Sequence, residues 1–265
     1  MQSTSRLLYE YQELQTRGIG RGSHEEYRPY LSVVRSKSHA RRTMMCLPTC
    51  GNRIMHLLSD SEVSAALLFD WNPDVIDIRE QYPLDPNRTL HIAKSLGFPH
   101  PGHTRGGAIM STDFLVTFRK PGGGVVHRAF QVKDRMAAVS ESLNTMRKLE
   151  IEKRYWAELH IEWRLIVAEQ FPRVRLRNLK FLAPYRRKLI TAESQEAFVR
   201  AVAPVLDSDE QVPISTLAPN LDPRVLDALK MLCAHRLTDF PVDTKDFLNC
   251  LPSDFSLRLD HARSK

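Results

Sequence analysis

The sequence predicts an α/β domain built on a central mixed sheet, followed by a mostly helical second domain. The patterns between residues 59 and 169 run in the order helix, strand, hairpin, helix, strand, which is typical of a mixed sheet covered by helices. After Gln170 the composition changes to a basic segment, FPRVRLRNLKFLAPYRRK, and then to short helical patterns and a strand-like tail. We therefore expect domains over residues 1–170 and 171–265.

The composition is that of a globular protein. The chain has 265 residues, 42% hydrophobic and 26% charged, which excludes wholesale disorder and a collagen-like repeat. It has no apolar run of about 18 residues, and charges near the N-terminus argue against a signal peptide, so we expect a cytosolic protein. The 38 Lys and Arg against 31 Asp and Glu give a net charge of +7. This surplus predicts an anionic partner, with nucleic acid ahead of an acidic membrane.

The cysteines indicate neither a disulfide scaffold nor a metal site. There are four in the whole chain, too few and too scattered for a disulfide framework. Cys46, Cys50 and His56 can supply three zinc ligands, but their spacing matches no common zinc finger and no fourth ligand follows at a suitable interval. We expect no zinc.

The elements before the hairpin follow from local patterns. The first 50 residues are rich in Arg and Ser and predict a basic arm or edge hairpin. Residues 59–70 begin with a Ser-x-x-Glu capping box and continue with apolar residues at helical spacing, which predicts a short buried helix. Residues 74–82, DVIDIREQY, alternate as a strand. Residues 85–110 hold three prolines and predict a long loop with one helical turn.

The later elements complete the predicted sheet. Residues 111–118 and 127–133 are β-type runs joined by a glycine-rich turn, which predicts a hairpin. Residues 140–160 place apolar side chains at helical spacing and predict a helix. The run IEWRLIVAE that follows is nearly continuous in apolar character and predicts another strand.

Strand alternation places three polar side chains of the hairpin on one face. Phe114 and Phe130 belong to the apolar faces of the two strands. Pairing these apolar faces puts Asp113, Gln131 and Lys133 together on the opposite side. An acid, an amide and a lysine therefore converge on one strip of the sheet.

Glu62 is a further candidate with two open interpretations. As the last residue of the capping box it is expected to reach back to the backbone N–H of Ser59. It also lies on the apolar stripe of its helix, with Ala65, Ala66 and Phe69 three, four and seven residues further on. A carboxylate that faces a core needs a cation or a metal as its partner.

These residue types suit metal-dependent phosphodiester hydrolysis. Mg²⁺ prefers oxygen ligands, which Glu62, Asp113, the Gln131 side-chain oxygen and the Val132 carbonyl can provide. Lys133 would place a positive charge beside the attacking water or the scissile phosphate. The spacing alone favours a solvent-exposed polar strip over a catalytic site, because short patterns recur by chance.

The succession of motifs resembles the TnsA endonuclease subunit of multi-component, cut-and-paste DNA transposons, including those that CRISPR complexes guide. Five motifs occur in the family's order over about residues 18–170: HLLSDSE, DVIDIREQYPL, MSTDFLV, FQVK and KLEIEKRYW. The resemblance implies a restriction endonuclease-like nuclease domain followed by a winged-helix-like helical domain. The C-terminal third resembles the family only in outline.

The resemblance also implies the site residues. Glu62 in SDSE, Asp113 in STDF, and Gln131 and Lys133 in FQVK match the family's active site, with Mg²⁺ as the cofactor and Mn²⁺ expected to substitute for it. This family, like this sequence, has Gln where restriction enzymes usually have Asp or Glu. Because a neutral ligand lowers the negative charge of the site, tight metal binding is expected to need the phosphate of bound DNA.

The partners implied by the resemblance are double-stranded DNA at the transposon ends, a TnsB-like transposase and a TnsC-like AAA+ ATPase, with no membrane. Family members cut the 5′ ends of the element, while the transposase cuts and joins the 3′ ends. A bacterial, nucleoid-associated protein of the cytoplasm is expected. The basic segment is a candidate for DNA or partner contact, through Arg173, Arg175, Arg177, Lys180, Arg186 and Arg187.

Two other functions remain open at this point. The chain could be a free-standing restriction-like or repair endonuclease, or a DNA-binding adaptor with an idle nuclease fold. The loop FPHPGHTRGG contains His100, His103 and Arg105 near the expected site. Histidines in polar loops are usually solvated, so the only role considered for them is DNA contact.

Overall fold

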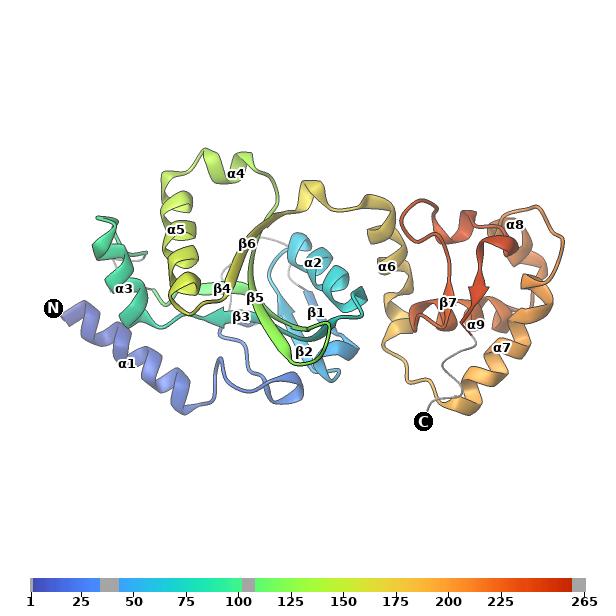
Figure 1. Ribbon diagram of the computed structural model, residues 1–265, viewed down its shortest axis with the longest axis horizontal. Coiled ribbons are helices and arrows are strands. Elements are labelled where there is room, and N and C mark those ends of the chain that lie inside the picture. The colour runs from blue at the N-terminus through green and yellow to red at the C-terminus, as the bar shows by residue number, and fades with distance from the viewer. Residues whose placement is uncertain (1, 34–42, 102–107, 259–265) are drawn as a thin grey trace. The chain divides into compact units, whose positions relative to one another are not determined.

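The computed structural model describes residues 2–33, 43–101 and 108–258 (Figure 1). The chain divides into two compact units, Met1–Gln170 and Phe171–Lys265, at the position where the composition changes. No helix in the described ranges is both long enough and apolar enough to span a membrane. His103, Arg105 and the basic run RSKSHARR fall outside the described residues.

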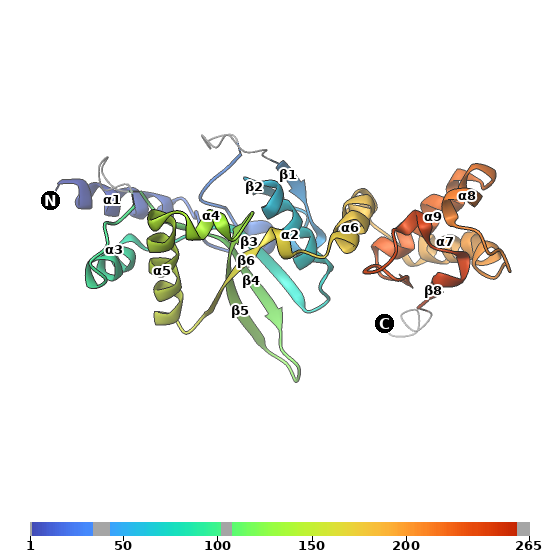
Figure 2. The same cartoon turned by 90° about the horizontal axis from the view of Figure 1, so that it is seen from above.

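Unit 1 is built on a mixed sheet of four strands in the order β3–β4–β5–β6. The first three strands are antiparallel neighbours and the last is parallel to β5, so the predicted mixed sheet is confirmed. The β4–β5 hairpin extends beyond the rest of unit 1 (Figure 2). The strands are β3 (Val75–Pro83), β4 (Ser111–Arg119), β5 (Val125–Lys133) and β6 (Glu162–Val167).

Two helices cover opposite faces of this sheet. Phe69 of α2 (Asp60–Trp71) packs against Phe114 and Phe130, with ring centroids 5.5 and 4.8 Å apart. Trp156 of α5 (Leu143–Glu158) belongs to a second core that includes the neighbouring strand residues Leu115 and Ala129. Because successive strand residues point to opposite faces, α2 and α5 lie on different sides. The predicted sorting of the hairpin side chains is thus confirmed.

Helix α2 begins as the capping box predicts. Ser59 is the N-cap, and its hydroxyl accepts the backbone N–H of Glu62 at 3.1 Å. The reciprocal bond differs from the prediction, because the Glu62 carboxylate accepts the backbone N–H of Leu58 at 2.9 Å. Glu62 therefore reaches one residue further than a standard capping box.

The loop prediction for residues 85–110 is wrong in its first half. Residues Pro86–Ser95 form a ten-residue helix, α3, with Asp85 as N-cap and Pro86 in the first turn. Proline is compatible with that position, and Ile92 and Ala93 are buried on the inner side of the helix. His100 is buried rather than solvated, and its Nε2 lies 2.9 Å from the Thr89 hydroxyl.

The prediction of a basic arm is wrong for the first residues. Residues Gln2–Thr16 form a helix, α1, and Leu7 is only 1% exposed. The segment is packed because its apolar side chains recur at helical spacing. An antiparallel two-stranded sheet of β1 (Thr43–Cys46) and β2 (Ile54–Leu57) follows, and its second strand lies beyond the first 50 residues. The remaining short elements of unit 1 are η1 (His24–Glu26), η2 (Pro48–Cys50), α4 (Ala137–Ser140) and η4 (Ala168–Gln170).

The residues considered as zinc ligands have other contacts. The Cys50 thiol is buried and lies 3.4 Å from the Ile78 carbonyl, and burial raises its pKa to about 12. The His56 Nδ1 accepts the backbone N–H of Val33 at 3.3 Å. Cys46 is half-buried and is not in a disulfide.

Unit 2 is mostly helical and has its own core. That core includes Leu182, Ile214, Leu232 and Phe247, each 0–1% exposed. Its one described sheet pairs two-residue strands, and the winged-helix assignment stays a prediction. The elements are α6 (Arg173–Arg186), α7 (Ala192–Leu206), α8 (Ile214–Leu217), η5 (Ala218–Asn220), α9 (Pro223–Ala234), β7 (Thr238–Asp239), η6 (Phe247–Asn249), η7 (Pro252–Asp254) and β8 (Ser256–Leu257).

Candidate active site

The site lies where strands β4 and β5 separate. Their ladder ends at the pair Phe114 and Phe130. One residue further, the Asp113 carboxylate accepts the backbone N–H of Val132, with 2.8 Å between Oδ2 and N. Strand β4 stays paired with β3 beyond this point, and β5 stays paired with β6 as far as Lys133. The two central strands therefore fork, and Asp113 stands at the opening.

One pocket of about 370 Å³ contains all four side chains that the sequence nominates. Glu62 comes from the first turn of α2, Asp113 from β4, and Gln131 and Lys133 from the end of β5. Elements far apart in the sequence thus contribute to a single cavity. Its other lining residues include Gln81, Ser111, Thr145, Lys148, Leu149 and Glu152.

Glu62 is buried and held by three donors. Its side chain accepts hydrogen bonds from Leu58 N–H, from the Ser59 hydroxyl and from the Gln81 amide at 2.9, 3.1 and 3.1 Å. Burial, together with the nearby charge of Asp113, raises the pKa of Glu62 to about 8 in spite of these bonds. A cation bound nearby would favour the ionised form of this carboxyl group.

Asp113 has the same conflict between burial and charge. Burial raises its pKa, while the positive charge of Lys133 and the Val132 N–H lower it. The side chains of Gln131 and Gln81 also lower the pKa of Asp113. Lys133 is thus the positive charge that most favours the ionised form of Asp113.

Gln131 has an unused acceptor. Its side chain is 8% exposed, and within the described ranges its Oε1 is buried without a hydrogen-bond partner. Buried polar oxygens are nearly always bonded, so this atom needs a donor or a cation. The Val132 carbonyl lies on the same side as its N–H, because both groups of one strand residue point the same way. It therefore points toward Asp113.

The donor set fits a hard divalent cation. Within the part of the chain that the structure describes, no three His, Cys, Asp or Glu side chains are grouped as metal ligands. The pocket offers two carboxylates instead, with the Gln131 Oε1 as a neutral oxygen. Val132 is not among its lining residues, although its N–H bonds to Asp113. Such an all-oxygen set with few charges suits Mg²⁺, which retains several waters, better than Zn²⁺.

Two residues of the pocket were missed by the sequence prediction. Glu152 of α5 is 3% exposed and accepts hydrogen bonds from the Thr112 hydroxyl and the Trp163 indole at 2.7 and 2.9 Å. Burial raises its pKa to about 8. Its position three residues after Leu149, on the apolar stripe of the helix, is the signal that could have found it. The other residue, Gln81, donates its side-chain amide N–H to Glu62 and lines the same pocket as Asp113.

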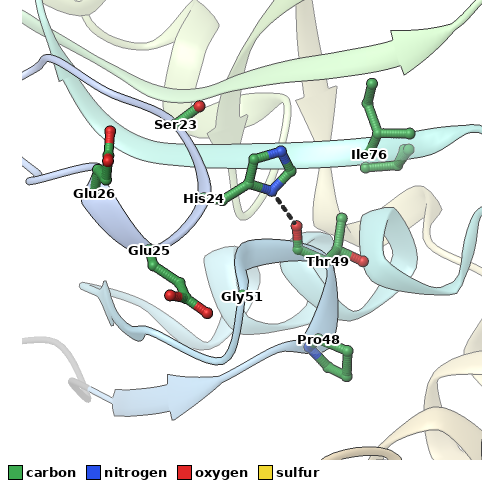
Figure 3. A pocket seen from close by; sticks show the side chains of 9 residues that line it. Ser23, His24, Glu25, Glu26, Pro48, Thr49, Gly51 and Ile76 are labelled. Atoms are coloured by element: carbon green, nitrogen blue, oxygen red, sulfur yellow. Dashed lines mark hydrogen bonds between the residues drawn. The ribbon is translucent and has the colours of Figure 1, made fainter.

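A second, shallower pocket holds no comparable chemistry. It has a volume of about 660 Å³ and is lined by Ser23 to Glu26, Pro48, Thr49, Gly51, Val75 and Ile76. Figure 3 shows that the Glu25 and Glu26 carboxylates point in different directions and that the His24 ring faces the Thr49 carbonyl, 3.3 Å away. These side chains do not converge on one point, so this pocket is not the catalytic candidate.

The predicted contact residues of the basic segment fall into different groups. Arg175 is paired with Asp243, and Arg177 forms two bonds to Asp246 at 2.8 and 3.1 Å. Much of their charge is therefore used within unit 2. Arg186 is half-buried in the last turn of α6. The remaining predicted contacts, Arg173, Lys180 and Arg187, are exposed.

The mixed sheet and the carboxylate pocket at its forked strands fit a nuclease domain. Residues 72–168 match the family described as TnsA-like endonuclease N terminal, a range that includes Asp113, Gln131 and Lys133 but not Glu62. The chain is 36% identical over 176 residues to the transposon Tn7 transposition protein TnsA of Escherichia coli, a match that covers 66% of this chain and 63% of that protein.

The two comparisons agree, because both relate this chain to TnsA. The resemblance that the motifs indicated is confirmed, and residues 72–168 of unit 1 match the TnsA-like endonuclease N-terminal domain. The match spans somewhat less than two thirds of the length of the curated relative.

Proposed function

We propose that this chain is the Mg²⁺-dependent DNA endonuclease subunit of a heteromeric transposase, which cleaves the 5′ ends of the element during cut-and-paste transposition. The observation that carries the proposal is the convergence of Glu62, Asp113, Gln131 and Lys133 on one pocket. The unpartnered Gln131 oxygen supports it, because that atom has a use when a cation is bound.

Four oxygen donors would hold the metal: the carboxylates of Glu62 and Asp113, the Gln131 Oε1 and the Val132 carbonyl. A bound Mg²⁺ supplies Lewis acidity that polarises a phosphate and lowers the pKa of a bound water. The Val132 N–H fixes one oxygen of Asp113 and leaves the other for the ligand position. Mn²⁺, with the same preference for oxygen, is proposed to substitute.

Lys133 is proposed to act on the substrate side of the site. It lines the same pocket, and its charge lowers the pKa of Asp113. An ammonium group beside the scissile phosphate would orient the attacking water and offset the negative charge that develops in the transition state. A neutral residue at this position would remove both effects.

The proposed substrate and partners follow from the relative and from the charge. The relative is a transposition protein of Tn7, and the net charge of +7 favours duplex DNA as ligand. We propose a TnsB-like transposase and a TnsC-like AAA+ ATPase as protein partners in the bacterial cytoplasm. Arg173, Lys180 and Arg187 are the proposed DNA or partner contacts in unit 2.

The test is a cleavage assay on transposon-end DNA with Mg²⁺, with and without the two partner proteins. We expect partner-dependent cleavage at the 5′ ends, lost in Asp113→Ala and in Lys133→Ala. Asp74→Ala and Lys153→Ala are the matched controls, because both side chains are exposed and neither lines the pocket.

The alternatives give different results in the same assay. A free-standing nuclease would cleave as well without partners as with them. An adaptor with an idle fold would leave the DNA intact in every combination. Cleavage that survives in both Asp113→Ala and Lys133→Ala would show that the chemistry takes place elsewhere.

A further inference from the structure

Gln81 has an unusual backbone for a residue inside a strand. Its φ is +48°, in the left-handed region that residues other than glycine rarely adopt. On either side of it the β3–β4 ladder is regular, with Glu80 opposite Phe114 and Tyr82 opposite Thr112. Gln81 is therefore a single irregular position directly across from Asp113.

The neighbouring structure holds this conformation in place. The Gln81 carbonyl accepts the backbone N–H of Tyr30 at 3.1 Å. The preceding carbonyl, that of Glu80, accepts the Tyr27 hydroxyl at 2.9 Å. A segment distant in sequence thus fixes the backbone on both sides of the left-handed residue. Strain that is maintained in this way is typical of functional sites.

The side chain of Gln81 contacts one carboxylate and lies across the strand pair from the other. It is 2% exposed, and its Nε2 donates to the Glu62 Oε2 at 3.1 Å. Its Oε1 lies 3.5 Å from the Ser111 hydroxyl, and both Gln81 and Asp113 line the same pocket. An amide nitrogen has two N–H donors, so one donor remains beyond the bond to Glu62.

An amide is suited to this place between two metal ligands. It donates a hydrogen bond to a carboxylate without adding a positive charge, which would repel a cation. A lysine or arginine here would neutralise the carboxylates and compete with the metal. An apolar residue would leave them without a partner on this side.

We propose that Gln81 is a positioning residue, whose side-chain amide orients Glu62 beside Asp113 for metal binding. The inference rests on the proposed function, because it assigns a role within that same site. Groups that orient metal ligands typically change metal affinity about 10- to 100-fold when they are removed.

Two variants distinguish the effect of the Gln81 amide from the effect of its strained backbone. Gln81→Met keeps a long side chain and the strained φ but loses both donors. Gln81→Gly also loses the amide, yet glycine adopts this φ without strain, so it folds even where Met does not. Asn52→Gly is the matched control, because Asn52 also has a positive φ, +60°, but does not line the pocket.

The experiment is a calorimetric titration of Mg²⁺ into the full-length protein bound to end DNA with an uncleavable linkage at the scissile position. Both Gln81 variants should bind Mg²⁺ about 10- to 100-fold more weakly than wild type, and the control should bind as wild type does. In the cleavage assay, Gln81→Gly should lower kcat and leave KM for DNA within about twofold, because the residue contacts the ligands and not the DNA.

The outcomes distinguish this inference from the proposed function. If wild type binds Mg²⁺ and either Gln81 variant that remains folded binds it within about twofold of wild type, the positioning role is wrong while the nuclease proposal stands. If wild type itself binds no Mg²⁺, the nuclease proposal is overturned and this one with it. Unfolding curves in EDTA establish which variants are folded.

Discussion

The Asp113 carboxylate takes the place of a strand partner for the backbone N–H of Val132, at 2.8 Å. This bond stands where the β4–β5 ladder would otherwise continue, and it lets the two strands diverge. Beside this opening, the Gln131 Oε1 lies in a pocket that Glu62 reaches from α2. One side chain therefore both ends the ladder and helps to build the proposed metal site.

DNA should strengthen metal binding. The donor set has two carboxylates and a neutral amide, so the phosphate of bound DNA would supply the missing negative charge. Calorimetry should show tighter Mg²⁺ binding to the DNA complex than to the free protein. Gln131→Glu is the matched variant: its extra charge should improve Mg²⁺ affinity without DNA and reduce the difference. Equal affinities of wild type with and without DNA would contradict this explanation.

The stability of the metal-free protein should depend on Glu62 and pH. Burial raises the pKa of Glu62 from 4.5 to about 8, so the folded state binds more protons than the unfolded state between these values. The contribution of Glu62 is fully present below about pH 4.5 and is lost as the pH rises through about 8, with a slope of at most about 1.4 kcal/mol per pH unit.

Urea unfolding in EDTA measures this dependence. From about pH 5 to about pH 9, the free energy of unfolding of wild type should fall relative to that of Glu62→Gln. The buried Glu152 has a raised pKa in both proteins, so its effect cancels in the difference. Parallel curves would mean that Glu62 is ionised in the folded protein without a metal.

The buried ion pair of Arg53 and Glu80 should be essential for the stability of the folded protein. Arg53 forms a two-bond pair with Glu80, 2.8 and 2.5 Å long, and Glu80 is fully buried. Arg53→Met leaves this carboxylate without its cation and should cost about 3–5 kcal/mol in unfolding free energy. The control, Arg6→Met, breaks the exposed pair with Glu10 and should cost less than about 1 kcal/mol. Similar small losses in both would show that Glu80 is not charged.

The basic residues of α6 and its C-terminal end should differ in their contribution to DNA binding. Each phosphate contact adds about 0.9 to the slope of log affinity against log salt concentration. Replacing Arg173, Lys180 and Arg187 by Ala should lower that slope by roughly 2 to 3. Replacing Arg175 and Arg177 should change it less, because acidic side chains of unit 2 already pair with them. An unchanged slope in the triple variant would assign this segment another role.

Much of the candidate site could be predicted because it depends on regular patterns. Strand alternation fixes which side chains share a face, so the sequence alone groups Asp113, Gln131 and Lys133. Glu62 carried its own signal, a carboxylate on an apolar helical stripe. The pairing of Phe114 with Phe130 confirms the register on which this grouping depends.

The residues and elements that could not be predicted depend on departures from those patterns. The left-handed φ of Gln81 reverses local geometry inside an otherwise regular strand, and no residue type in REQYP signals it. Helix α3 was obscured by prolines that in fact stand at its start and beyond its end. The Glu62 carboxylate accepts the Leu58 N–H and the Gln81 amide because the fold brings these groups together. The local sequence carries no signal for that arrangement.

The most direct test of the proposed metal site is the anomalous scattering of Mn²⁺ in crystals of the complex with uncleavable end DNA. We expect a peak in contact with the Asp113 carboxylate and the Gln131 Oε1, close to Glu62, which disappears in Asp113→Ala. A peak at other residues, such as those around His24, or a peak that persists in Asp113→Ala, would contradict the assignment of these side chains as metal ligands.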